Sequence, residues 1–289
     1  MKLHQDPQWP RASDWLAAEC EGEVLITVIG APLNRSVTPG RCDLGPQAIR
    51  KVLARFSTYE FGSRGDVAKA AIRDLGDSAP TDIENAVRET EGIVCLFGGD
   101  NGATRPGVRG LGVPLERVGV LTLDAHLDLR HLDDGPMNGN PIRGLIEDGV
   151  KGENIVQIGL QSFANSSAYA EFGRDLGLCW ITEEDCHRGN FEEIFDQALE
   201  ELAGRVDIVA FDLDLDVMDR AFAPGCPGSR PGGLAPWQVR RAARIAGRHP
   251  KVQYLDLVEL DPELDEGDRT AMAAAACFLE FVAGVQERS

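Results

Sequence analysis

Two apolar segments each lead directly into a cluster of potential metal ligands, and this pattern constrains the fold more than any other feature. The first segment, Gly119–Leu123, is followed by Asp124, His126 and Asp128. The second, Asp207–Phe211, is followed by Asp212, Asp214 and Asp216. In an extended backbone, a spacing of two residues places side chains on one side. Carboxylates crowded in this way repel one another unless a cation neutralises them. The pattern therefore predicts that both clusters bind divalent metal.

A single Asp-x-Asp at the end of a strand is more often part of a turn or a helix cap. Two such clusters, one of which carries a histidine, favour a dinuclear metal centre. Its ligands would be mostly oxygen with one imidazole, a set that suits manganese better than zinc or copper.

Short apolar runs alternate with helical segments along the chain, which is typical of βαβ units and a parallel sheet. We expect about eight strands, at 24–29, 71–75, 93–97, 119–123, 155–158, 179–181, 207–211 and 252–257. Helices are expected at 45–56, 81–90, 103–111, 142–148, 168–176, 191–203, 236–248 and 270–283. The ligand candidates follow strand C-termini, where α/β folds place their sites. We predict one α/β domain over residues 1–289, with 1–22 as an N-terminal lead-in.

Composition narrows the possible partners and the compartment. A net charge of −18 argues against nucleic acid and anionic membranes. No run reaches the ~18 apolar residues of a membrane span, and Met1–Trp9 lacks the apolar core of a signal peptide. Seven scattered cysteines without a C-x-x-C pair favour a reducing cytoplasm. Cys226, beside the second cluster, either lines the site or, more commonly for such a residue, packs in the core.

Four motifs in order resemble those of the arginase/agmatinase (ureohydrolase) family. They are Gly98–Asn101 (Gly-Gly-Asp-Asn), Asp124–Asp128, Asp214–Asp219 continuing to Gly225, and Glu259 within Leu257–Pro262. Within the family, the segments Asp128–Arg130, Asn138–Pro141 and Gln157–Ser166 are most similar to formimidoylglutamases of histidine degradation.

The resemblance implies a three-layer αβα fold with a mainly parallel sheet of about eight strands, and two Mn²⁺ ions roughly 4 Å apart that share a bridging hydroxide. It implies metal ligation by Asn101, Asp124, His126, Asp128, Asp214 and Asp216. Asp124 and Asp214 would bridge both ions, Asp128 and residue 101 would complete one, and His126 and Asp216 would bind the other. Glu259 would accept hydrogen bonds from the cationic formimidoyl or guanidino group, and Asp219 would cap a turn. His126, Asp128 and Glu259 are the catalytic candidates.

The sequence departs from the family pattern at two positions. Asn101 stands where the family usually has a histidine. The carbonyl oxygen of asparagine is neutral and is a poorer ligand than imidazole. Asn138 lies in the segment where arginases and agmatinases often carry a proton-shuttling histidine. His131 could substitute, although an exposed loop histidine is the commoner case. Asp128 could instead deliver the proton that the departing amine needs.

Substrate carboxylates need positive partners, and guanidinium groups bind carboxylates with two parallel bonds. Arg130 and Arg143 are the candidates, and they favour N-formimidoylglutamate over agmatine, which carries no carboxylate. The full set of substrate-binding candidates is Arg130, Asn138, Asn140, Arg143, Asn165 and Glu259. We predict hydrolysis of N-formimidoyl-L-glutamate to L-glutamate and formamide by a cytoplasmic homo-oligomer. The alternatives are a guanidino hydrolase that releases urea and a metal-poor, non-catalytic relative.

Overall fold

The computed structural model describes residues 6–288, so residues 1–5 of the expected lead-in, and Ser289, lie outside it. Its centre is an eight-stranded sheet with the order β4-β1-β5-β10-β9-β6-β7-β8, in which every neighbouring pair is parallel. The strands are β1 (Ile26–Ala31), β4 (Ile72–Asp77), β5 (Ile93–Gly98), β6 (Val118–Leu123), β7 (Ile155–Leu160), β8 (Cys179–Thr182), β9 (Ile208–Asp214) and β10 (Val252–Val258). The predicted parallel sheet is confirmed.

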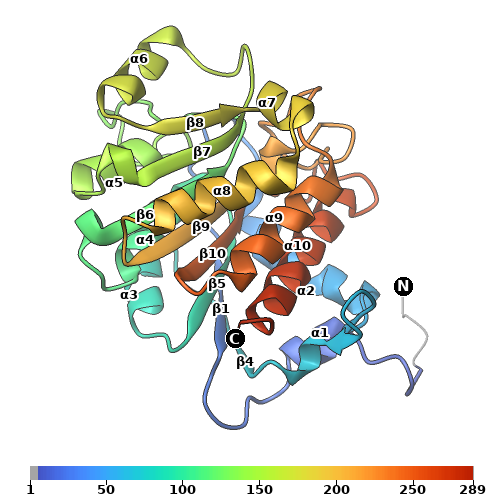
Figure 1. The fold of residues 1–289 in the computed structure, drawn as a ribbon. Coiled ribbons are helices and arrows are strands. Elements are labelled where there is room, and N and C mark those ends of the chain that lie inside the picture. Colours follow the sequence, from blue (N-terminus) through green and yellow to red (C-terminus); the bar gives the residue numbers. More distant parts are fainter. Residues whose placement is uncertain (1–5, 289) are drawn as a thin grey trace.

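Helices cover both faces of the sheet, which gives the predicted three-layer αβα arrangement (Figure 1). One face packs against α1 (Ala12–Leu16), α2 (Gly45–Val52), α7 (Glu183–Arg188), α8 (Phe191–Ala203), α9 (Pro236–Arg248) and α10 (Arg269–Val285). The other packs against α3 (Ile83–Arg88), α4 (Thr104–Gly110), α5 (Pro141–Asp148) and α6 (Ser167–Asp175).

The two faces follow from the alternation of side chains along each strand. In β5, Cys95 and Phe97 point into the first core, and Val94 and Leu96 point into the second. Because both faces are covered, the central strands are apolar at nearly every position rather than at every second one. This explains why continuous apolar runs identified them.

Local signals in the sequence set where several helices begin. Pro46, Pro141 and Pro236 lie in the first turns of α2, α5 and α9, where the missing N–H needs no partner. Ser166 caps α6 by accepting a hydrogen bond from the N–H of Tyr169, at 3.3 Å.

A short strand pair and helix α7 (Glu183–Arg188) were not expected. The short antiparallel pair β2 (Tyr59–Glu60) and β3 (Gly65–Asp66) lies outside the main sheet. Helix α7 follows β8 and begins with a capping box in which Thr182 and Asp185 bond reciprocally. The Thr-x-x-acid spacing was available in the sequence as a signal for this helix.

Three long loops follow C-terminal ends of strands and surround one cavity at that edge of the sheet. They are residues 32–43 after β1, 124–140 after β6 and 215–235 after β9. Residues from each of them line the cavity, which has a volume of about 300 Å³. The order of the sheet places β9 between β6 and β10, so that their three ends meet here.

Candidate metal centre and active site

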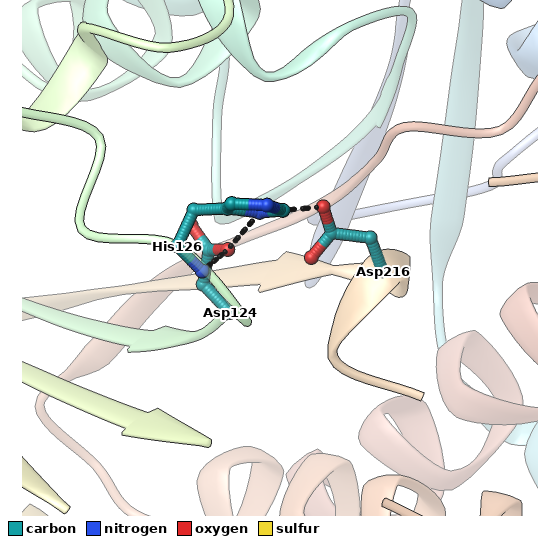
Figure 2. A group of neighbouring side chains, drawn as sticks. All are labelled: Asp124, His126 and Asp216. Carbon is teal, nitrogen blue, oxygen red and sulfur yellow. Dashed lines mark hydrogen bonds and ion pairs between the residues drawn. The ribbon is translucent and has the colours of Figure 1, made fainter. Parts of the chain in front are cut away.

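Asp124, His126 and Asp216 form a compact group at the adjoining ends of β6 and β9 (Figure 2). One potential ligand atom from each lies within 4.8 Å of the others. Nδ1 of His126 is 2.9 Å from Oδ2 of Asp216 and 3.5 Å from Oδ1 of Asp124. The backbone N–H of His126 also donates to Oδ1 of Asp124, at 2.6 Å. The two sequence clusters therefore meet in space, as the predicted dinuclear centre requires.

The remaining ligand candidates surround this group. Asp128 and Asp214 line the same cavity as His126 and Asp216. Asn101, in a short 3-10 helix after β5, donates from Nδ2 to Oδ2 of Asp128 at 2.8 Å. All six predicted metal-binding residues thus lie at one edge of the sheet, although their roles as ligands remain predictions.

The spacing of the first cluster predicted an extended backbone through Asp128, and this prediction was wrong. Strand β6 ends at Leu123, so Asp124, His126 and Asp128 do not project from an extended strand. Asp128 has a left-handed backbone, with φ of +51°. This conformation is uncommon for residues other than glycine, although aspartate tolerates it better than most. With this backbone conformation, Asp128 lines the cavity.

Burial and mutual repulsion of the carboxylates dominate the electrostatics. Burial, and then the neighbouring Asp216, raise the pKa of Asp124 to about 6. The pKa values of Asp128 and Asp214 are raised well above the usual range, again first by burial and then by nearby carboxylates. Burial opposes charge on His126 too, but Asp216 and Asp124 outweigh it and raise the pKa of the imidazole to about 11. Such a cluster favours any cation that can be placed within it.

A divalent cation fits the residues that are present. Oδ2 of Asp124 is fully buried and has no hydrogen-bond partner, which is costly for a carboxylate oxygen unless it binds a cation. Gly228 leaves space beside the group, because a Cβ at this position would lie 2.2 Å from Oδ2 of Asp216. Carboxylates with one imidazole are the donor set that manganese accepts.

Glu259 approaches the cavity from the end of β10. It is buried, it lies just past the strand with φ of +66°, and it lines the cavity. Its Oε1 accepts hydrogen bonds from the backbone N–H of Asn101 (2.8 Å) and from Nδ2 of Asn138 (3.0 Å). Burial raises the pKa of Glu259 to about 8, and the hydrogen bond from Asn101 opposes this rise. A cationic substrate group would relieve the cost of its buried charge.

A second polar network lies beneath the centre. Thr104 donates from Oγ1 to Oδ1 of Asn101 at 2.6 Å and lies 3.5 Å from Oδ1 of Asp212. Asp212 is paired in register with Asp256, which accepts a hydrogen bond from Tyr254 Oη at 2.9 Å. Burial and the neighbouring Asp256 raise the pKa of Asp212 well above its usual range. Asp212 therefore belongs to the layer that orients Asn101, beneath the ligands.

The cavity brings together three of the predicted substrate-binding residues besides Glu259. They are Arg130, Asn138 and Asn165. Nδ2 of Asn165 donates to the backbone carbonyl of Ala125 at 3.0 Å, and its Oδ1 accepts from the N–H of Leu127 at 2.7 Å. Its amide thus fixes the loop that carries His126. Among the described residues, no carboxylate pairs with the exposed guanidinium of Arg130.

Two predicted substrate-binding residues do not line this cavity. Arg143 stacks over Phe172, 3.9 Å from the ring centroid, and pairs with Glu147 along α5. Asn140 is buried and braces the loop before α5 by donating to the carbonyls of His131 and Gly135. Helical periodicity makes Glu147 the natural partner of a residue four positions earlier, and this competing partner was overlooked for Arg143.

His131 and Cys226 do not reach the cavity either. His131 is an exposed loop residue near Asp133, in keeping with the commoner alternative for such a histidine. Cys226 is fully buried in the core beside the cavity, and its neighbours Pro227 and Gly228 form the wall. Burial raises the pKa of its thiol well above the usual value, so it is not activated as a nucleophile.

Sequence reasoning missed one charged residue of the cavity. Arg230 lies in the loop after β9, and its Nη1 is 2.6 Å from Nε2 of His126. It is the only arginine between Ala221 and Gly233. The available signal was the long segment between the predicted strand at 207–211 and the predicted helix at 236–248, in which Arg230 lies.

A comparison with protein families matches residues 25–284 to the Arginase family. The chain belongs to this family. The fold and the meeting of the motifs at one edge of the sheet agree with that assignment.

The chain is similar to proteins described as formimidoylglutamases. It is 35% identical over 274 residues to that of Halalkalibacterium halodurans, covering 89% of this chain and 86% of the relative. It is 28% identical to that of Bacillus subtilis, covering 94% and 90%. The crystal structure of formimidoylglutamase from B. subtilis superposes with a TM-score of 0.93 at 26% identity, covering 99% and 95%. The Trypanosoma cruzi formiminoglutamase with Mn²⁺ superposes with a TM-score of 0.85 at 25% identity, covering 97% and 100%.

Proposed function

We propose that this protein is a dimanganese hydrolase that converts N-formimidoyl-L-glutamate and water to L-glutamate and formamide. The observation that carries the proposal is the group formed by Asp124, His126 and Asp216, with an orphaned carboxylate oxygen, beside a cavity that holds a buried glutamate and two arginines. The similarity to formimidoylglutamases across most of the chain supports it.

The residues would divide the work as follows. Asn101, Asp124, His126, Asp128, Asp214 and Asp216 would hold two Mn²⁺ ions. When bound, these ions activate water for attack on an electron-poor carbon. Glu259, held by Asn101 and Asn138, would accept hydrogen bonds from the cationic formimidoyl group and orient its carbon. Both donors hold the same oxygen of Glu259, Oε1. The second oxygen, Oε2, therefore remains to accept a hydrogen bond from the substrate.

The reaction breaks the bond between the formimidoyl carbon and the glutamate nitrogen. The oxygen of water joins that carbon, and the departing nitrogen needs a proton. Asp128 is the candidate to carry it, because it is a carboxylate that lines the cavity beside the proposed metal centre. The hydrogen bond from Nδ2 of Asn101 to Oδ2 holds the carboxylate of Asp128 in place. No described histidine other than His126 lines the cavity.

The alternatives make different demands on the cavity. A guanidino substrate without carboxylates, such as agmatine, would leave the unpaired guanidinium of Arg130 without a partner. A non-catalytic, metal-poor protein would retain a cluster of buried carboxylates without relief, which is a costly arrangement. Each alternative therefore leaves charged residues of the site without a binding partner, whereas the proposed reaction supplies one.

The experiment is a substrate panel with protein purified without chelator and assayed with added Mn²⁺. N-formimidoyl-L-glutamate, agmatine, 4-guanidinobutyrate and arginine are compared at equal concentration, with metal content measured in parallel. Formamide release from the first substrate alone supports the proposal. Urea release from a guanidino compound at a higher rate, or failure to bind manganese, would refute it.

Two broader expectations belong to the same proposal. We propose that the enzyme is a cytoplasmic homo-oligomer. Within residues 6–288, every helix is too short or too polar to cross a membrane.

A further inference from the structure

Arg230 occupies an unusual electrostatic position in the cavity. Its half-buried guanidinium contacts Nε2 of His126 at 2.6 Å and donates to the carbonyl of Gly228 at 2.9 Å. Most cavity charges of this chain are negative, yet none of the described carboxylates pairs with Arg230. The structure thus places an arginine on the far side of a metal-ligand candidate, with donor capacity to spare.

The two nitrogens of His126 face different surroundings. Nδ1 faces Asp124 and Asp216, on the side where the three potential ligand atoms converge. Nε2 faces Arg230 alone among the described residues. When a cation takes the lone pair of Nδ1, a neutral imidazole carries its proton on Nε2. Nε2–H and the guanidinium are then both donors and cannot bond to each other.

An acceptor within reach of both donors is therefore needed once metal is bound. Histidines that bind metal almost always donate their second N–H to a carboxylate, a carbonyl or water. No such carbonyl or carboxylate is provided for Nε2 by residues 6–288. A guanidinium beside it selects an anionic acceptor, and it can bind a carboxylate with two bonds.

We propose that Arg230, together with Nε2–H of His126, binds the α-carboxylate of the substrate and so determines specificity. This inference rests on the proposed function and assigns one substrate group to one residue. The α-carboxylate is separated from the formimidoyl carbon by only one nitrogen and one carbon, so it must lie close to the metal ligands. Arg230 meets this condition because it contacts one of them.

Arg130 then remains for the distal carboxylate. It is exposed and lines the same cavity, where Gly139 lies against its side chain. A cavity of about 300 Å³ suits a small dicarboxylate of this kind. Two unpaired arginines for two carboxylates would explain why the acidic metal centre accepts an acidic substrate.

The test uses Arg230→Met, Arg230→Lys and Arg130→Met in the Mn²⁺-loaded protein, with Arg143→Met as the matched control. Arg143 lies in α5, directly after the loop of residues 124–140, and it pairs with Glu147 outside the cavity. Three substrates separate the carboxylates: N-formimidoyl-L-glutamate, N-formimidoylglycine, which keeps only the α-carboxylate, and 4-(formimidoylamino)butyrate, which keeps only the distal one. Binding of L-glutamate is measured by calorimetry, and manganese content by metal analysis.

We expect Arg230→Met to weaken L-glutamate binding and raise KM by roughly 10- to 100-fold for the two substrates with an α-carboxylate, because a charge-assisted hydrogen bond is lost. The butyrate compound should be affected less than threefold, manganese content should be unchanged, and Arg230→Lys should restore part of the binding. Equal losses on all three substrates would overturn the proposal, as would wild-type affinity for L-glutamate or lost manganese in Arg230→Met.

Failure of the proposed function has a different signature. In that case the wild-type protein does not hydrolyse N-formimidoyl-L-glutamate at all, whatever residue 230 is. Calorimetry still tests the role of Arg230 in that case. L-glutamate binding that depends on Arg230 supports a carboxylate site. A wild-type protein that does not bind L-glutamate refutes this site.

Discussion

The backbone N–H of Asn101 donates a hydrogen bond of 2.8 Å to Oε1 of Glu259, which joins the segments that follow β5 and β10. Glu259 is thereby fixed by a residue that is itself a ligand candidate. The same asparagine donates from its side chain to Asp128. In the proposed mechanism, Asn101 would therefore connect the residue that orients the substrate with the residue that transfers the proton.

Glu259→Gln should lower kcat/KM by about 10²-fold or more, the usual loss when one electrostatic contact to a reacting group is removed. The amide keeps an oxygen that can accept from Asn101 and Asn138, so the fold and the manganese content should be retained. Steady-state kinetics with metal analysis checks this. Activity close to that of the wild type would show that the charge of Glu259 does not contact the substrate.

Asp128→Asn should lower kcat by about 10²- to 10⁴-fold, as expected for loss of a general acid–base group. The loss should persist when manganese occupancy has been restored by adding excess Mn²⁺, because proton transfer to the departing nitrogen would still be missing. Occupancy is measured on the same sample as the rate. Turnover that recovers with occupancy would remove the proton-transfer role.

Thr104→Val should weaken manganese binding by about 10- to 100-fold, because residues that orient a ligand contribute to metal affinity in this range. Oγ1 of Thr104 donates to Oδ1 of Asn101 at 2.6 Å. Thr122→Val is the matched control. Thr122, in β6, is as buried as Thr104, but its hydroxyl has no hydrogen-bond partner. Equal affinities for the two variants, measured by competition with a metal indicator, would contradict this prediction.

Arg130→Met should raise KM for N-formimidoyl-L-glutamate by about two- to fivefold, because an exposed ion pair contributes little. N-formimidoylglycine, which lacks the distal carboxylate, should show no comparable change. Arg130 is exposed at the edge of the cavity, which sets the small magnitude. An equal effect on all substrates would exclude carboxylate binding by this residue.

Metal-free protein should lose stability as the pH rises from about 5 to about 9. The pKa of Asp124 is raised to about 6 and that of Glu259 to about 8, so in this window the folded protein binds more protons than the unfolded chain. His126 acts in the same direction, because above its ordinary pKa of 6.5 the folded imidazole, with a pKa of about 11, holds a proton that the unfolded chain has released. Added Mn²⁺ should therefore raise Tm more at pH 8.5 than at pH 5.5.

Thermal unfolding with and without Mn²⁺ at the two pH values provides the measurement. Asp124→Asn is the comparison variant, and it should show a weaker pH dependence because it removes one of the titrating groups. A metal-free Tm that does not change between these pH values would contradict the prediction.

The strands of the sheet and the polar residues at their C-terminal ends could be identified from the amino-acid sequence alone. Runs such as Ile93–Gly98 and Val118–Leu123 are apolar throughout because both faces of a parallel sheet are covered, and this makes them recognisable without any tertiary information. The Asp and His motifs were recognisable because their residue types and spacing serve one chemistry, whatever the surrounding loops do.

Tertiary structure decided which charged side chains meet at the cavity. Arg143 was drawn to Glu147, one helical turn away, and Asn140 to backbone carbonyls of its own loop. Arg230 reached His126 from 104 residues away in the chain. Such partners depend on how long loops fold over the edge of the sheet, and no local periodicity specifies that path. The sequence therefore determined the metal chemistry, whereas the fold determined which arginines are available to select the substrate.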